Sequence, residues 1–211
     1  MTSEYNYKSS IKASRAKSVG TSSEFCDYKT GRMVTCLSQG EMRFWHILRW
    51  NDDVLDIKEQ YPLDDNLVDK IYITLFGENS VNPEIEATKQ LTTDFFVTLR
   101  NGEKRAFQIK PNLNSINNPH DLKRLQVEKL YFKALGIPWK LIFTDDINLI
   151  YFDNIKRAVT YYDASKVHDQ TSMYQHLVAT KKIRDIDMQS KPLDWKKLAE
   201  DYFRKAGDSN G

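Results

Sequence analysis

The stretch TTDFFVTLRNGEKRAFQIK, residues 92–110, contains two runs rich in β-branched and aromatic residues on either side of Asn101-Gly102. An Asn-Gly pair between two such runs is a strong signal for a β-hairpin. Pro111 follows the second run, and a proline cannot donate a hydrogen bond to a strand ladder. The stretch therefore predicts two antiparallel strands, the second of which ends before Pro111.

Two loops could close this hairpin, and each sets a different register. A two-residue turn at Asn101-Gly102 mixes polar and apolar side chains on both faces of the strands. A three-residue loop that also includes Arg100 puts the glycine at the left-handed position of a bulge and pairs Asp94 with Gln108. This second register sorts the side chains better. Because a slip of one residue moves every side chain to the other face, we predict the second register.

The predicted register brings three polar side chains to the end of the hairpin that lies away from the turn: Asp94, Gln108 and Lys110. An Asp on one strand and an x-Lys pair on the next is similar to the PD-(D/E)xK nucleases. A carboxylate binds a hard divalent cation, which acidifies a water and polarises a phosphate. The lysine adds a compact positive charge. The spacing alone is a weak signal, since Gln108 stands where many such nucleases have Glu.

A second carboxylate for such a metal site could come from Glu41. Ser38 and Glu41 have the spacing of a capping box at the start of a helix, and Glu41 shares a helical stripe with Trp45 and Leu48. The stripe directs Glu41 towards the core, where a carboxylate is costly unless it is paired or bound to a metal. The alternative is that Glu41 only completes the capping box.

The remaining chain alternates between helical and extended patterns. We expect strands near 32–37 and 54–57, helices at 42–50, 119–135 and 153–162, a buried central strand at 139–143, an ambiguous element at 67–76, and two amphipathic stretches at 169–182 and 193–206. This order predicts an α/β fold with a mixed central sheet flanked by helices. The expected domains are a flexible basic arm at 1–27, a catalytic domain at 28–162 and a small helical C-terminal region at 163–211.

The composition narrows the class of protein only slightly. The net charge of +2 is compatible with nucleic-acid binding without indicating it. No run approaches the roughly 18 apolar residues of a membrane helix. Two cysteines and four histidines show neither a disulfide framework nor the spacing of a zinc site. We therefore expect a cytoplasmic protein with no membrane partner.

Several motifs, taken in order, resemble the TnsA family of transposon endonucleases. They are Leu37-Ser38 with Glu41, VLDIKEQYPL at 54–63, Thr93-Asp94-Phe95, FQIKP at 107–111, GIPW at 136–139 and IFTD at 142–145. The motifs span residues 28–162, and their order and spacing are specific. The chain is therefore identified as a member of this family.

The resemblance implies a restriction-endonuclease-like fold and a DNA endonuclease that uses one or two Mg²⁺ ions, with Mn²⁺ able to substitute. It implies that the catalytic residues are Glu41, Asp94, Gln108 and Lys110. The ions would be held by the first three of these and, on the following helix, by Glu128. The alternative for Glu128 is a half-buried salt bridge.

The resemblance also implies a place in a heteromeric transposase in the bacterial cytoplasm, at the nucleoid during transposition. The family member hydrolyses the non-transferred strand at the 5′ ends of the element, a TnsB-like partner cuts and joins the 3′ ends, and a TnsC-like ATPase regulates both. Well-known members carry a winged-helix-like C-terminal domain, for which residues 163–211 are short, so we expect partner binding by helices there. The alternatives are a stand-alone restriction or repair nuclease and a non-catalytic DNA-architectural subunit of the same fold.

Basic side chains outside the cluster are candidates for contacts to double-stranded DNA. Lys12, Arg15 and Lys17 lie in the expected arm, and His120 and Lys123 lie in the helix that follows the Gln-x-Lys strand. Phosphate contacts of this kind would add affinity without reading sequence. For each of the five the alternative is a solvated surface position.

Overall fold

The computed structural model describes residues 7, 22–77 and 90–208 and divides into two compact units. The first consists of Met1–Phe25 with Met33–Asp146, and the second of Cys26–Arg32 with Ile147–Gly211. The boundary between them after Asp146 lies earlier in the chain than the expected one after residue 162. The reason is that helix α5 (Leu149–Val159) packs against helix α6 (Gln170–Ala179), so it belongs with the C-terminal helices.

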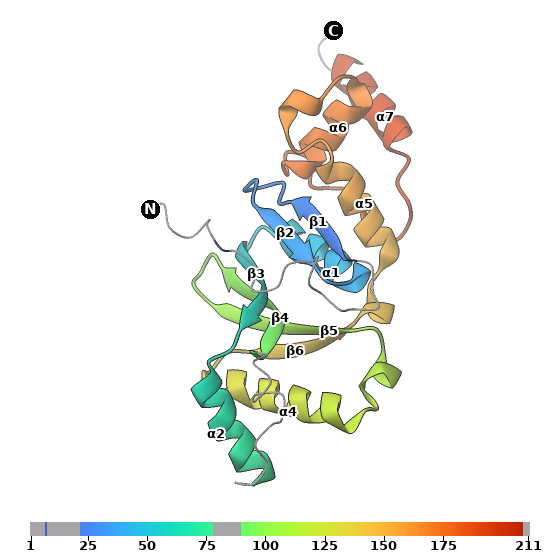
Figure 1. Cartoon of the computed structure of the whole chain (residues 1–211). Coiled ribbons are helices and arrows are strands. Elements are labelled where there is room, and N and C mark those ends of the chain that lie inside the picture. The colour runs from blue at the N-terminus through green and yellow to red at the C-terminus, as the bar shows by residue number, and fades with distance from the viewer. Residues whose placement is uncertain (1–6, 8–21, 78–89, 209–211) are drawn as a thin grey trace. The chain divides into compact units, whose positions relative to one another are not determined.

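The first unit is built on a four-stranded sheet with the order β3-β4-β5-β6. Its strands are β3 (Val54–Pro62), β4 (Thr92–Leu99), β5 (Lys104–Lys110) and β6 (Trp139–Phe143), as Figure 1 shows. Strand β4 is antiparallel to both β3 and β5, and β5 pairs with β6 in parallel. The expected mixed α/β sheet is confirmed. The expectation that 139–143 is a buried central strand is wrong, because β6 has a single neighbour among the described strands and is only half-buried.

The register of the β4–β5 hairpin is the one that the sorting of side chains predicted. Phe95 pairs with Phe107, and Phe96 pairs with Ala106. Gly102 has a φ of +86°, and the Leu99 N–H donates to the Glu103 carbonyl over 2.8 Å. The three-residue loop with a left-handed glycine is therefore confirmed, and it places residues 94, 108 and 110 at the far end of the hairpin from the turn.

Helices α2 (Asp65–Phe76) and α4 (Pro119–Ala134) cover one face of the sheet (Figure 1). The ambiguous stretch 67–76 is helical, because the Asp64 side chain caps its start by accepting a bond from the Leu67 N–H. A buried apolar cluster joins these helices to the sheet; its members are Leu63, Val68, Ile71, Phe96, Ala106, Val127, Tyr131 and Phe132. This packing fixes α4 against the strands that carry the polar cluster.

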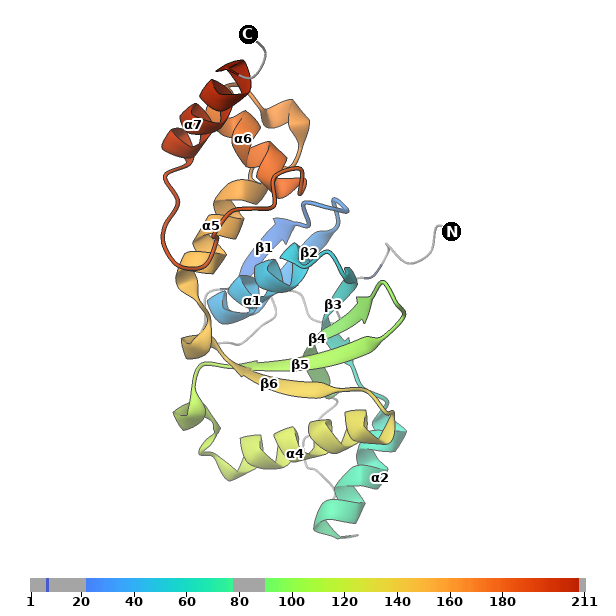
Figure 2. The same cartoon turned by 180° about the vertical axis from the view of Figure 1, so that it is seen from behind.

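Helix α1 (Gln39–Trp50) lies on the other face of the sheet, beside the two-stranded sheet of β1 (Ser23–Cys26) and β2 (Met33–Cys36), as Figure 2 shows from behind. The Phe44 ring packs against Phe95 and Phe107, with 5.3 Å between the centroids of Phe44 and Phe107. Strand β1 falls within the expected arm 1–27, so the expectation of a flexible arm is wrong for Ser23–Cys26. The short strand is held by Phe25, whose ring stacks on His46.

The second unit contains α5, α6, α7 (Trp195–Asp208) and the 3₁₀ helix η5 (Ala164–Lys166). Asn154 of α5 donates to the carbonyls of Met188 and Lys191 and accepts from the Leu193 N–H, so one buried amide fixes the chain that leads into α7. The first unit has two further 3₁₀ helices, η3 (Leu113–Ile116) and η4 (Thr144–Asp146). Within the described residues, every helix is too short or too polar to cross a membrane.

Candidate functional site

Glu41 lies in the first turn of α1 and is buried, with 7% of its surface exposed. One carboxylate oxygen, Oε2, accepts bonds from the Leu37 N–H over 2.8 Å and from the Gln60 side-chain amide over 3.1 Å. The other, Oε1, accepts from the Ser38 hydroxyl over 2.9 Å, and the Ser38 Oγ in turn accepts from the Glu41 N–H. Ser38 therefore caps α1, and Glu41 bonds to the capping hydroxyl while it faces the interior, as the helical stripe predicted. Its role as a metal ligand stays a prediction.

Asp94 of β4 is tied directly to strand β5. Its Oδ2 accepts a hydrogen bond of 2.7 Å from the N–H of Ile109, the residue between Gln108 and Lys110. The Gln108 side chain also hydrogen bonds to Asp94. The Gln108 Oε1 is buried and has no hydrogen-bond partner among the described residues. A buried amide oxygen without a donor is available to a cation or a water.

The electrostatics show that these groups share one site. Burial, and after it the nearby charge of Asp94, raise the pKa of Glu41 to about 7. Burial raises the pKa of Asp94 to about 6, against the opposing effects of the Ile109 N–H and of the cationic Arg124 and Lys110. Because the interaction between two charges weakens with distance, charged groups that shift one another's pKa lie near one another. The structure therefore brings together Glu41, Asp94, Gln108 and Lys110.

Lys110 ends β5 between two acidic groups. Its Nζ lies 3.9 Å from the Asp121 Oδ1 in the first turn of α4, and its charge also lowers the pKa of Asp94. Both members of this ion pair are partly exposed, so the pair is weak and the ammonium group stays accessible. Lys110 is thus placed to meet an anion that approaches the carboxylates.

Glu128 of α4 is fully buried next to this cluster. Its Oε1 accepts bonds from the Thr93 hydroxyl over 2.6 Å and from the Trp139 indole over 2.8 Å. Burial raises its pKa to about 7. Both donors are neutral, so the half-buried salt bridge considered from the sequence is not what holds it. The Oε2 atom is buried without a hydrogen-bond partner in the described part of the chain.

The donor set can be tested against a hard divalent cation. Among residues 7, 22–77 and 90–208, no three His, Cys, Asp or Glu side chains are grouped so as to hold a metal ion. The site offers instead two carboxylates, from Glu41 and Asp94, and the free amide oxygen of Gln108. Mg²⁺ is commonly bound by one or two carboxylates, with water and substrate phosphate completing its shell. The residues therefore fit such an ion in chemistry, with part of its shell left to water and substrate.

Comparison with known proteins shows which family the central part of the chain resembles. Residues 51–144 match the family model described as TnsA-like endonuclease N terminal. The chain carries a TnsA-like endonuclease N-terminal domain. It is also 35% identical over 143 residues to the transposon Tn7 transposition protein TnsA of Escherichia coli, a match that covers 66% of this chain and 50% of that protein. The chain thus spans about half the length of the curated relative it matches.

The mixed sheet with flanking helices is the restriction-endonuclease-like fold of a TnsA-like domain. The region that matches the family model includes Asp94, Gln108, Lys110 and Glu128, whereas Glu41 precedes it. The place of Glu41 in the cluster consequently rests on the structure and on the order of motifs in the sequence.

The structure describes two of the five basic residues that are expected to contact DNA. Lys12, Arg15 and Lys17 lie outside the described residues. His120 is exposed at the start of α4, in keeping with a surface position. Lys123 of the TnsA-like domain holds its ammonium 5.0 Å from the centroid of the Phe76 ring, which directs the side chain towards α2. A role of these residues in DNA binding remains a prediction.

Two residues of the cluster escaped the sequence analysis. Arg124 acts on both Asp94 and Glu128, and its guanidinium lies 3.4 Å from the Thr92 carbonyl oxygen. It precedes Glu128 by four residues, one helical turn, and that spacing was a usable signal. Gln60 lies in the VLDIKEQYPL segment, but nothing in its sequence context shows that its amide reaches Glu41.

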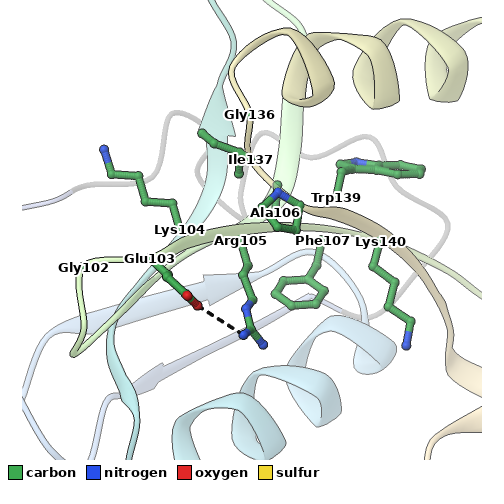
Figure 3. A pocket seen from close by; sticks show the side chains of 11 residues that line it. Gly102, Glu103, Lys104, Arg105, Ala106, Phe107, Gly136, Ile137, Trp139 and Lys140 are labelled. Atoms are coloured by element: carbon green, nitrogen blue, oxygen red, sulfur yellow. Dashed lines mark hydrogen bonds and ion pairs between the residues drawn. The ribbon is translucent and has the colours of Figure 1, made fainter.

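A cavity of about 840 Å³ opens at the other end of β5 in the TnsA-like domain. Figure 3 shows Lys104, Arg105 and Lys140 among its lining residues, together with Trp139 and Phe107. None of its lining residues belongs to the carboxylate cluster. At about 3.3 Å per residue along a strand, Arg105 and Lys110 are roughly 16 Å apart. The cavity is therefore separate from the candidate active site.

Proposed function

We propose that this chain is the Mg²⁺-dependent DNA endonuclease subunit of a TnsA/TnsB-type transposase, which hydrolyses the non-transferred strand at the 5′ ends of the transposon. The observation that carries the proposal is the meeting of Glu41, Asp94 and Lys110 at one end of the β4–β5 hairpin, in a chain with a TnsA-like endonuclease domain. A buried carboxylate and a half-buried one beside a lysine suit phosphodiester hydrolysis better than a purely architectural role.

Glu41 and Asp94 would hold the ion, Mg²⁺ or Mn²⁺, and the Gln108 Oε1 would contribute a neutral oxygen. When bound, the ion would polarise the scissile phosphate and lower the pKa of a water. The protein fixes the direction of the Asp94 carboxylate through the 2.7 Å bond from the Ile109 N–H. The raised pKa values of both carboxyls follow from burial, and a bound cation would favour their ionised forms.

Lys110 is proposed to face the phosphate. In the reaction the oxygen of water attacks phosphorus in line, the bond from phosphorus to the leaving deoxyribose oxygen breaks, and that oxygen takes up a proton. Negative charge grows on the phosphate oxygens in the transition state, and the Lys110 ammonium would stabilise it. Its weak pairing with Asp121 leaves it free to turn towards the substrate.

Glu128 is proposed as the ligand of a second ion. Its Oε1 is engaged by Thr93 and Trp139, so the Oε2 atom, which has no hydrogen-bond partner among the described residues, is the one available. The charge of Asp94 contributes to the raised pKa of Glu128, and this supports a second ion close to the first.

The partners are proposed from the similarity to a transposition protein. They are the transposon-end DNA, a TnsB-like transposase and a TnsC-like ATPase, all in the bacterial cytoplasm. The helical residues 163–211 are proposed to bind the protein partners. The basic N-terminal residues Lys12, Arg15 and Lys17 are proposed to contact DNA, as are His120 and Lys123.

A plasmid-nicking assay tests this proposal. Supercoiled DNA that carries a transposon end is incubated with the chain and Mg²⁺ or Mn²⁺, with and without the TnsB-like and TnsC-like proteins. We expect 5′-end nicking that requires a metal and the partners and that is lost in Asp94→Ala but kept in Asp153→Ala, a change at an exposed acid on α5. Metal-dependent nicking without partners would instead indicate a stand-alone nuclease. No nicking under any condition would indicate an architectural subunit.

A further inference from the structure

Gln60 has an unusual backbone for a strand residue. Its φ is +44°, and the only other described non-glycine residue with a positive φ is Lys181, at +62°. Residues other than glycine are strained in this left-handed region. Such strain persists only where the surrounding structure imposes it, and it gathers at functional sites. We therefore expect a local interaction to impose the positive φ of Gln60.

The left-handed residue breaks the alternation of strand β3. Glu59 and Gln60 are consecutive, yet both are buried with 1% of their surface exposed. The Glu59 Oε1 accepts from the Thr35 N–H on β2, and the Gln60 amide donates to the Glu41 Oε2 on α1. Two successive side chains thus reach elements on the same side of the sheet, which a regular strand does not allow.

The strand geometry before Gln60 is held from outside the sheet. Among the described strands β3 lies at one end of the sheet, and the Tyr7 hydroxyl donates to the Glu59 carbonyl over 2.8 Å. This bond lies on the peptide that leads into Gln60, so it limits how far the peptide can rotate. The side chain of Gln60 is consequently aimed at Glu41 by a constrained backbone.

We propose that Gln60 is a positioning residue that holds the Glu41 carboxylate in the orientation required to bind a divalent cation. The inference rests on the proposed endonuclease function and adds a residue to it. With Leu37 and Ser38, Gln60 gives the carboxylate three donors on its two oxygens. The amide donor is neutral, so it orients Glu41 without placing a cation that would repel the metal. Loss of a hydrogen bond to a side chain that binds a metal typically lowers metal affinity or activity by about 10–100-fold.

The main test replaces the donor and keeps the length of the side chain. Mn²⁺ binding is measured by calorimetry for wild type and Gln60→Met, and nicking is followed as a function of Mn²⁺ concentration. We expect Mn²⁺ affinity to fall about 10–100-fold, with nicking recovered at high Mn²⁺. Gln175→Met is the matched control, since Gln175 is also buried and donates to a backbone carbonyl, that of Arg157, over 3.3 Å. It should bind Mn²⁺ as wild type does.

A second variant separates the amide from the backbone. Gln60→Gly removes the donor and relieves the strain at φ +44°. We expect it to lose Mn²⁺ affinity to the same extent as Gln60→Met. Lys181→Gly is its control: it relieves the other left-handed residue and should leave Mn²⁺ binding unchanged.

The outcomes distinguish a failure of the Gln60 role from a failure of the proposed endonuclease function. Wild-type Mn²⁺ affinity in Gln60→Met or Gln60→Gly would overturn the positioning role and leave the endonuclease proposal intact. A loss of nicking that high Mn²⁺ does not recover, together with a lowered melting temperature in both variants, would also overturn it, because Gln60 would then be needed only for folding. A wild-type protein that binds no Mn²⁺ would overturn both proposals.

Discussion

The Asp94 carboxylate accepts a hydrogen bond of 2.7 Å from the backbone N–H of Ile109, across the β4–β5 hairpin. This bond joins the acidic residue of one strand to the point of the next strand where Gln108 and Lys110 lie on either side. The three-residue loop at the turn makes it possible, because it sets the register of every pair that follows. The far end of the hairpin thereby becomes a place where opposite charges meet.

Replacing Asp94 by asparagine should remove nicking while keeping the fold. The amide oxygen can still accept from the Ile109 N–H, and a buried charge is lost, so the melting temperature should stay the same or rise. Nicking should fall by at least about 100-fold, since one of two carboxylate ligands is gone. Quantitative nicking in the presence of partners checks this. Asp94→Asn activity equal to that of the control Asp153→Asn would contradict the role of Asp94.

The two members of the Lys110–Asp121 pair should differ sharply when each is changed. Lys110→Ala should lower nicking by about 10²–10³-fold, the loss typical of removing one group that stabilises charge in a transition state. Asp121→Asn should leave nicking within about threefold and stability within about 1 kcal/mol, because a partly exposed pair at 3.9 Å contributes little. Equal losses in the two variants would show that the ion pair, rather than the lysine alone, is required.

Glu128→Gln should change the pH dependence of stability. Burial raises the pKa of this carboxyl from an ordinary 4.5 to about 7. The folded protein then holds the proton more tightly than the unfolded chain, so the contribution to stability is full below pH 4.5 and is lost as the pH rises through 7.

The side chain of glutamine at position 128 is neutral at every pH. At pH 8 without metal we expect it to be more stable than wild type by about 1–3 kcal/mol, after allowing for a buried amide that lacks a partner. At pH 5, where Glu128 is protonated, the gain should vanish. Thermal and urea unfolding at the two pH values measure the difference. The same stability difference at both pH values would show that the carboxyl does not titrate in this range.

Metal affinity should rise with pH in a range set by two carboxyls. Burial brings the pKa of Asp94 to about 6 and that of Glu41 to about 7 in the metal-free protein. A cation competes with protons for these oxygens, so Mn²⁺ should bind weakly at pH 5, progressively tighter up to pH 7, and with little further change above pH 8. Calorimetry across this range, with Asp94→Asn as the reference that lacks one of the two groups, provides the measurement. Affinity independent of pH in wild type would contradict binding at this pair.

Local patterns in the sequence were enough to predict the hairpin and its register. The Asn101-Gly102 turn and the sorting of Phe95 and Phe107 depend only on neighbours in the chain, and so does the helix cap at Ser38. The burial of Glu41 followed from the helical stripe that it shares with Trp45. Where spacing within one element sets the geometry, the sequence carried the information.

The parts that the sequence did not reveal depend on contacts between distant segments. Strand β6 lies at the end of the order of the described strands, and the apolar run at Trp139–Phe143 does not reveal that order. The bond from Gln60 to Glu41 needs a left-handed residue inside a strand, and propensity argues against one there. The two neutral donors of Glu128 come from β4 and β6, which are separated by β5 both in the chain and in the sheet.

The central claim is that Glu41, Asp94 and Gln108 form a binding site for a divalent cation. A crystal of the chain soaked in Mn²⁺ tests this most directly through the anomalous signal of the metal. We expect a peak within about 2.0–2.6 Å of a carboxylate oxygen of Glu41 and of Asp94, with the Gln108 Oε1 turned towards it. A fully soaked crystal with no peak there, or with manganese bound only elsewhere on the protein, would contradict the claim.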